Sequence, residues 1–123
     1  MAKIFLDTNY VIDALHRKPE KEILTSLEGS IVYLSPLSIH IYCYIFKNNQ
    51  IKKQLLAQIE KFQFVDFSEN IVTRALQGPT SDFEDNVQLH SAADADCDFF
   101  LTANKKLLAM KFFGKVSICD TKE

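Results

Sequence analysis

Five short apolar runs of strand length recur along the chain, and most of the segments between them have the spacing of amphipathic helices. The runs are Lys3–Leu6, Ile31–Leu34, Phe62–Val65, Phe99–Leu101 and Val116–Cys119. Near-continuous apolar character is typical of strands covered on both faces, and alternation with helices favours a parallel sheet. The sequence therefore predicts an α/β fold, a three-layer α/β/α sandwich with a central parallel sheet of about five strands.

Local signals mark where helices begin. Ser35-Pro36 combines an N-cap residue with proline in the first turn, and residues 50–61 carry apolar side chains at helical spacing. Ser81-Asp82-Phe83-Glu84 has the pattern of a capping box, which predicts a helix from about Asp82 to about Ala95. Gly78-Pro79 breaks the chain just before it.

Composition bounds the class of protein. The 123 residues suit one domain over residues 1–123, and 47% hydrophobic with 24% charged residues excludes a disordered chain. No apolar stretch is long enough to span a bilayer and no secretory signal is visible, so we expect a cytoplasmic protein without membrane contact. The three cysteines show no paired spacing for a disulfide or a zinc site. A net charge of −2 argues against nucleic-acid binding through bulk positive charge.

Polar residues follow two of the predicted strands directly. Asp7-Thr8-Asn9 comes after the first strand, and Thr102-Ala103-Asn104 comes after the fourth. The carboxyl ends of parallel strands share one edge of the sheet, and Asp85, in the first turn of the capped helix, can face the same edge. Taken alone, Asp7 also fits a helix N-cap. The sequence therefore predicts a polar site at this edge, with Asp7 at its centre.

Three motifs stand in a fixed order along the chain: Ile-Phe-Leu-Asp-Thr-Asn near the N-terminus, Ser-Asp-Phe-Glu-Asp at the start of a helix, and the strand Asp98-Phe-Phe-Leu-Thr102 with a polar residue two positions later. Together they resemble the PIN domain, and within it the VapC-like toxins of toxin–antitoxin pairs. The resemblance covers essentially the whole chain. It implies a Mg²⁺- or Mn²⁺-dependent ribonuclease with an RNA substrate and a small antitoxin protein as partner. Carboxylates serve such cleavage by holding cations that stabilise the attacking and leaving oxygens.

The resemblance assigns roles residue by residue. Asp7 matches the first acid of the family and Asp85 the third, so these two are the expected metal ligands, and Asn104 joins them as a catalytic residue. The residues expected to support the site are Asn9, Ser38, Asp82 and Thr102. Those expected to meet RNA phosphates are Lys105 and Lys106.

Two acidic positions of the family are vacant in this chain. The second acid should follow a Ser or Thr on the helix after the second strand, where Ile41 stands, and no Asp or Glu occurs from Gly29 through Ile59. The fourth position holds Asn104, whose amide oxygen can coordinate without charge. Mg²⁺ is commonly held by one or two carboxylates with water and substrate phosphates, so we expect a single, weakly bound Mg²⁺ or Mn²⁺. Asp82, one turn before Asp85, is the best local substitute, although an acid there also suits the helix dipole.

Three functional hypotheses follow. The first is a toxin-like PIN ribonuclease with a degraded acidic site, and the second is a catalytically weakened PIN domain that acts by binding RNA or a protein partner. The third, a phosphoryl-transfer domain with Asp7 as nucleophile, ranks last, because the haloacid-dehalogenase pattern requires an acid where Asn9 stands. We also expect a homodimer. The aromatic residues expected in core or dimer contacts are Tyr42, Tyr44, Phe46, Phe112 and Phe113.

Overall fold

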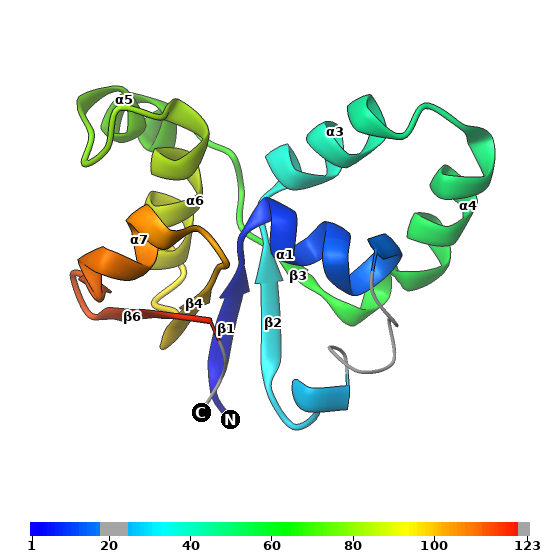
Figure 1. The fold of residues 1–123 in the computed structure, drawn as a ribbon, viewed down its shortest axis with the longest axis horizontal. Coiled ribbons are helices and arrows are strands. Elements are labelled where there is room, and N and C mark those ends of the chain that lie inside the picture. Colours follow the sequence, from blue (N-terminus) through cyan, green and yellow to red (C-terminus); the bar gives the residue numbers. More distant parts are fainter. Residues whose placement is uncertain (18–24, 121–123) are drawn as a thin grey trace.

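A computed structural model describes residues 1–17 and 25–120, which form a central sheet between two layers of helices (Figure 1). The strands are β1 (Lys3–Leu6), β2 (Ile31–Leu34), β3 (Gln63–Phe64), β4 (Phe99–Leu101), β5 (Phe112–Phe113) and β6 (Val116–Cys119). Their order across the sheet is β3-β2-β1-β4-β6-β5. The predicted three-layer α/β fold is confirmed.

All five predicted strands are present and all pair in parallel, although β3 is shorter than the predicted run Phe62–Val65. A sixth strand, β5, which the sequence pattern does not predict, pairs antiparallel with β6. This hairpin turns at Gly114, whose φ of 60° is a conformation that glycine adopts without strain. Two-residue strands give no periodicity, so β5 had no signal beyond its turn glycine.

The helices are α1 (Thr8–Ile12) continued by a π-helical turn (Asp13–Arg17), α3 (Pro36–Ile45), α4 (Asn49–Gln58) continued by a 3₁₀ turn (Ile59–Lys61), α5 (Glu69–Gln77), α6 (Phe83–Asp94) and α7 (Lys105–Met110). Ser35 caps α3 as predicted, by accepting from the Leu37 N–H. The predicted capping box is wrong in its register. Asp82, not Ser81, caps α6, because its backbone is extended and its Oδ1 accepts from the Asp85 N–H at 3.0 Å.

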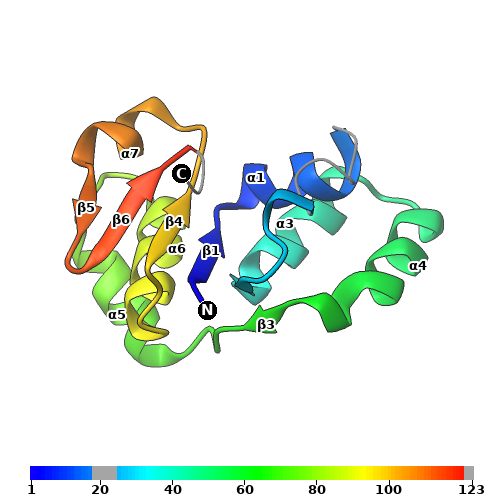
Figure 2. The same ribbon diagram turned by 90° about the horizontal axis from the view of Figure 1, so that it is seen from below.

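Side chains alternate between the two faces of the sheet, which explains the three layers. Ile4 and Leu6 belong to the apolar cluster that also contains Val11 of α1. Phe5 points to the opposite face, where it stacks on Phe100 with ring centroids 5.6 Å apart and joins a cluster formed with α5, α6 and α7. Figure 2 shows α1 and α3 on one side of the sheet and α5 and α6 on the other.

The chain reverses its direction of travel across the sheet between β1 and β4. From β1 it proceeds outward through β2 and β3, and it then returns to add β4 and β6 on the other side of β1. Ligands of open α/β sheets bind in the crevice outside the carboxyl ends of the strands at such a switch point. The ends of β1 and β4 are therefore the place to look for a site. Among the described residues, no helix has the length and apolar character needed to cross a membrane.

Candidate active site at the carboxyl edge of the sheet

Asp7 lies at the switch point, directly after β1, and is only 5% exposed. Its backbone N–H donates to the Leu101 carbonyl of β4, which fixes it beside the end of that strand. The carboxylate Oδ1 accepts from the Thr8 N–H and Oδ2 accepts from the Thr102 hydroxyl, each at 2.8 Å. Asp7 is thus the N-cap of α1 as well as the centre of the predicted edge. Each of its oxygens still has a lone pair for another partner.

A hydrogen-bond chain leads from Asp7 to Asp85. The Thr102 hydroxyl accepts from the Asn104 N–H at 3.0 Å, and the Asn104 side-chain Nδ2 donates to Asp85 Oδ2 at 3.5 Å. The Asn104 Oδ1 accepts from the Lys106 N–H at 2.9 Å and so caps α7. Because a backbone N–H can be met only by an acceptor, the amide oxygen is committed to α7. Asn104 therefore faces Asp85 with hydrogen-bond donors.

Glu84 is a third carboxylate of this edge that the sequence analysis missed. It is partly buried in the first turn of α6. Burial raises the pKa of Glu84, the hydrogen bond to Thr8 lowers it, and the nearby charges of Asp7 and Asp82 raise it again. The capping-box interpretation had already given Glu84 a purely structural role. Its position next to Asp85, at the start of a helix that faces the site, is the sequence feature that could have indicated a role for Glu84 in the site.

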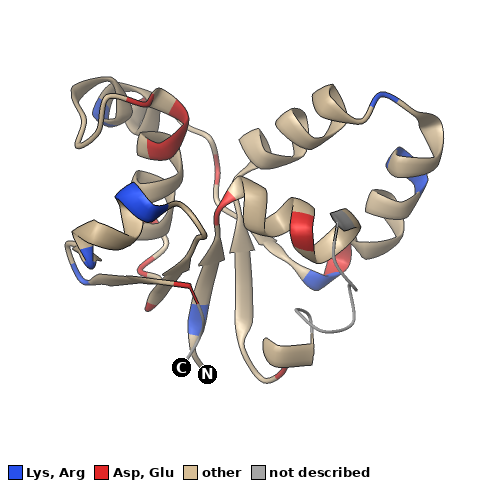
Figure 3. Cartoon of the chain, in the orientation of Figure 1, with Lys and Arg blue, Asp and Glu red and all other residues tan. Residues whose placement is uncertain are grey.

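The acids of this edge repel one another. Burial, followed by the charges of Asp82, Asp7 and Glu84, raises the pKa of Asp85 to about 6, and the charge of Lys106 lowers it. Burial also raises the pKa of Asp7, although its hydrogen bonds to Thr102 and Thr8 lower it. Figure 3 shows the acidic residues at the end of β1 and the start of α6 and the basic residues at the start of α7. Ionisation of these acids is costly unless a cation is present.

Comparison with known proteins identifies the family. A family model described as the PIN domain matches residues 3–106. The chain belongs to the PIN domain family. A chain of the crystal structure of VapBC2 from Rickettsia felis, bound to a DNA fragment from their promoter, has the same fold, with a TM-score of 0.69 and 14% sequence identity. The alignment covers 94% of this chain and 96% of that chain. No curated protein matches.

PIN domains generally depend on a divalent metal, so the donor set of this PIN domain can be tested against that requirement. Among the described residues, no three His, Cys, Asp or Glu side chains are grouped so that they could hold one metal ion together. Ile41, which is expected at the second acidic position, is partly buried on α3, and Asn104 presents hydrogen-bond donors to Asp85. The edge nevertheless concentrates carboxylates whose mutual repulsion a cation would relieve. This set fits one Mg²⁺ or Mn²⁺ held by two carboxylates and water, and does not fit a two-metal centre.

Of the six other expected site residues, three act on Asp7 or Asp85 and three do not hydrogen-bond to an acidic residue in the described part of the chain. Thr102 contacts Asp7 directly, Asp82 acts on Asp85 through its charge, and Lys106 is near enough to Asp85 to lower its pKa. Ser38 is buried and hydrogen-bonds to Thr8 rather than to an acid. Asn9 and Lys105 are exposed, and in the described part of the chain no hydrogen bond joins either side chain to the acidic residues.

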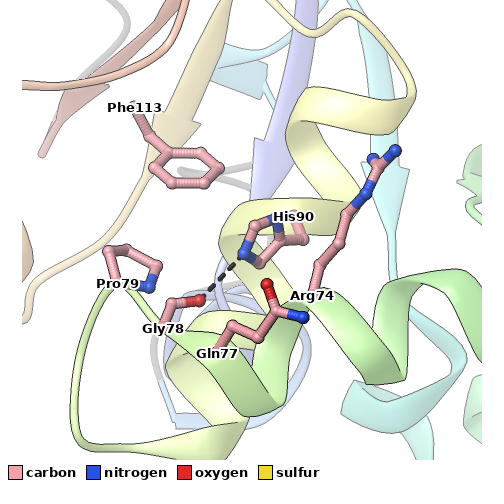
Figure 4. A pocket seen from close by; sticks show the side chains of 6 residues that line it. All are labelled: Arg74, Gln77, Gly78, Pro79, His90 and Phe113. Carbon is pink, nitrogen blue, oxygen red and sulfur yellow. Dashed lines mark hydrogen bonds between the residues drawn. The ribbon is translucent and has the colours of Figure 1, made fainter.

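The histidines lie outside the acidic edge. His40 is exposed, and His16 packs on Phe46 with ring centroids 4.1 Å apart. His90 Nε2 lies 2.9 Å from the Gly78 carbonyl, in an open pocket of about 230 Å³ that Phe113 and Arg74 also line (Figure 4). The three histidines therefore either pack against other side chains and backbone or face solvent.

The raised pKa of Asp85 predicts a pH-dependent stability of the metal-free protein. Between the usual pKa of 3.8 and the folded-state pKa of about 6, the folded state holds the proton more tightly than the unfolded chain. The free energy of unfolding should therefore decrease as the pH rises through this window and remain low above it. In EDTA, we expect Asp85→Asn to weaken this decrease and to raise the melting temperature at neutral pH by about 3 °C. Thermal unfolding curves of both proteins across this pH range test the prediction, and parallel curves would contradict it.

Proposed function

We propose that this PIN domain is a metal-dependent endoribonuclease of the toxin–antitoxin type, with one weakly bound Mg²⁺ or Mn²⁺. The observation that supports the proposal is the cluster of Asp7, Glu84 and Asp85 at the switch point of the sheet, where each carboxyl has a raised pKa. Carboxylates repel a phosphodiester unless they hold a cation between themselves and the substrate. A nuclease is the activity that best explains such a cluster in a PIN fold.

In this proposal each residue has a distinct task. Asp7 and Asp85 hold the cation, which, when bound, polarises a phosphate oxygen and lowers the pKa of a bound water. Thr102 and the Thr8 N–H fix the Asp7 carboxylate, since each donates to one of its oxygens. Glu84 supplies, through an intervening water, negative charge that the family takes from the position of Ile41. Lys105 and Lys106, at the exposed start of α7, bind the RNA backbone.

A second candidate is a weakened PIN domain that acts by binding RNA or a protein partner. The orientation of Asn104 favours this candidate, because amide donors facing Asp85 stabilise that carboxylate without a cation. In either case we propose a small antitoxin as partner, since the VapBC2 structure that shares this fold is named for such a pair. A homodimer remains part of the proposal.

Titration with Mn²⁺ separates the two candidates. For the ribonuclease we expect cleavage of a fluorescent single-stranded RNA that begins at millimolar Mn²⁺ and is absent in EDTA. The same titration should raise the melting temperature, by about 4 °C at ten times the Kd, because a cation bound only by the folded state adds about 1.4 kcal/mol. A rise in melting temperature without cleavage would favour the binding domain. If Mn²⁺ produced no cleavage and no rise in melting temperature at any concentration, that result would contradict the proposed metal site.

A further inference from the structure

Three buried polar side chains form a chain of hydrogen bonds next to the acidic edge. Among the described residues, none of these three side chains hydrogen-bonds to Asp7 or Asp85. Gln88 of α6 and Ser38 of α3 are both fully buried, and Thr8 of α1 is only 2% exposed. The Ser38 hydroxyl donates to Gln88 Oε1 at 3.3 Å, and the hydroxyls of Ser38 and Thr8 lie 2.9 Å apart. The Thr8 side chain also lies close enough to Glu84 to lower the pKa of that carboxyl. The hydrogen-bond chain therefore joins three helices and ends next to one carboxylate of the site.

The number of hydroxyl protons in this hydrogen-bond chain limits the acceptors to which Thr8 can donate. Each hydroxyl has one proton to donate. When Ser38 donates to Gln88 Oε1, the bond between the two hydroxyls must be donated by Thr8, and no Thr8 proton is left for Glu84. This arrangement also leaves Gln88 Nε2 buried with no hydrogen-bond partner in the part of the chain that the structure describes. An unpaired buried donor is unfavourable, because no hydrogen bond offsets the loss of its contact with water.

Turning the Gln88 amide over by half a rotation reverses every bond of the chain. Nε2 then donates to Ser38, Ser38 donates to Thr8, and Thr8 donates to Glu84. Oε1 takes the unpaired place, and a buried carbonyl oxygen without a partner is better tolerated than a buried N–H. Glutamine suits this position because one side chain offers both a donor and an acceptor. A core position with no polar task would hold an apolar residue of similar size, such as Met.

We propose that Gln88 is a positioning residue of the acidic site: by directing its amide nitrogen to Ser38, it orients the Ser38 and Thr8 hydroxyls toward Glu84 and holds that carboxylate beside Asp7. This inference rests on the proposed metal-dependent function, because it gives Glu84 its place next to the cation. Groups that orient the surroundings of a metal typically change its affinity by about 10–100-fold when they are removed.

The test compares Gln88→Met with Ser91→Ala. Met keeps the volume of Gln88 but has no amide, so we expect Mn²⁺ affinity, measured from the electron paramagnetic resonance signal of free Mn²⁺, to fall about tenfold. Ser91 is the matched control, since it is fully buried on the same helix and its hydroxyl has no partner among the described residues. Ser91→Ala should bind Mn²⁺ like the wild type. If Gln88→Met does not fold, Ser38→Ala interrupts the same chain, and Ser38→Thr, which keeps the hydroxyl, should restore affinity.

A metal-free measurement distinguishes failure of this inference from failure of the proposed function. In EDTA, Ser38→Ala should shift the Gln88 side-chain amide resonances in a ¹H–¹⁵N spectrum, because their hydrogen-bond acceptor is lost. Unshifted resonances, or equal Mn²⁺ affinity of Gln88→Met and Ser91→Ala, would overturn the inference and leave the metal site intact. Shifted resonances in a protein that binds no Mn²⁺ would instead overturn the proposed function, and the positioning role with it.

Discussion

Asp7→Asn is expected to abolish Mn²⁺-dependent RNA cleavage, with a loss of at least about 100-fold, because removal of a direct ligand should exceed the effect of removing its supports. Asp7 is the buried carboxylate at the switch point, and its oxygens are aligned by Thr8 and Thr102. The asparagine has one oxygen instead of two and no charge, so it cannot replace the carboxylate toward a cation.

The same substitution should leave the fold intact. Asparagine can accept from the Thr8 N–H through its oxygen and donate through its nitrogen to the Thr102 hydroxyl, which already accepts from Asn104. Removing a buried carboxylate with a raised pKa also removes a desolvation cost. The melting temperature of Asp7→Asn in EDTA should therefore equal or exceed that of the wild type, whereas its response to Mn²⁺ should disappear.

Steady-state cleavage of a fluorescent RNA measures the first effect and thermal unfolding measures the second. Asp94→Asn is a matched control, since Asp94 is exposed at the opposite end of α6. Its cleavage rate should equal that of the wild type. Retained cleavage by Asp7→Asn would show that Asp7 is a structural cap and that any nuclease activity lies elsewhere.

The sequence predicted the strands and the position of Asp7 at the edge of the sheet because both depend on local pattern. Short apolar runs identify strands covered on both faces, and an acid directly after such a run lies at the carboxyl edge, as Asp7 does. Thr102 follows β4 in the same way, and the pairing of Leu6 with Leu101 brings the two residues together. These placements need no knowledge of side-chain conformation.

The features that the sequence did not predict depend on hydrogen-bond direction. A one-residue shift of the helix cap from Ser81 to Asp82 changes Glu84 from a capping residue into a side chain whose pKa Thr8 lowers. Whether Asn104 offers an oxygen or a nitrogen to the site depends on the Lys106 N–H, which only the folded geometry brings to the amide. Gln88 was overlooked because a polar residue inside a helix is usually exposed, and this one is fully buried.

Restoring both vacant acids, with Ile41→Glu and Asn104→Asp, should produce a large gain of function. Aspartate at position 104 can cap α7 with one oxygen and offer the other to a cation, which the amide cannot do. Ile41 belongs to none of the apolar clusters formed by the described residues, so a glutamate there does not displace core packing. We expect Mn²⁺-dependent cleavage to rise at least about tenfold, the lower end of what metal-site groups contribute.

The gain should be accompanied by a loss of stability without metal. Two more carboxylates beside Asp7, Glu84 and Asp85 increase the repulsion that already raises the pKa of Asp85 to about 6. In EDTA at neutral pH the melting temperature of the double variant should fall by about 5 °C, which corresponds to roughly 1–2 kcal/mol for a domain of this size. Mn²⁺ should then raise it by more than it raises that of the wild type, because tighter binding to the folded state gives a larger shift.

The variant Ile41→Gln with Asn104 unchanged separates charge from shape, since glutamine has nearly the size of glutamate but no charge. This variant should show neither the gain in cleavage nor the fall in melting temperature in EDTA. Equal melting temperatures of the double variant in EDTA and Mn²⁺, together with unchanged cleavage, would mean that positions 41 and 104 do not face the cation. In that case the resemblance to the acidic positions of other PIN domains would not extend to these two residues, and the binding function would become the better explanation of the site.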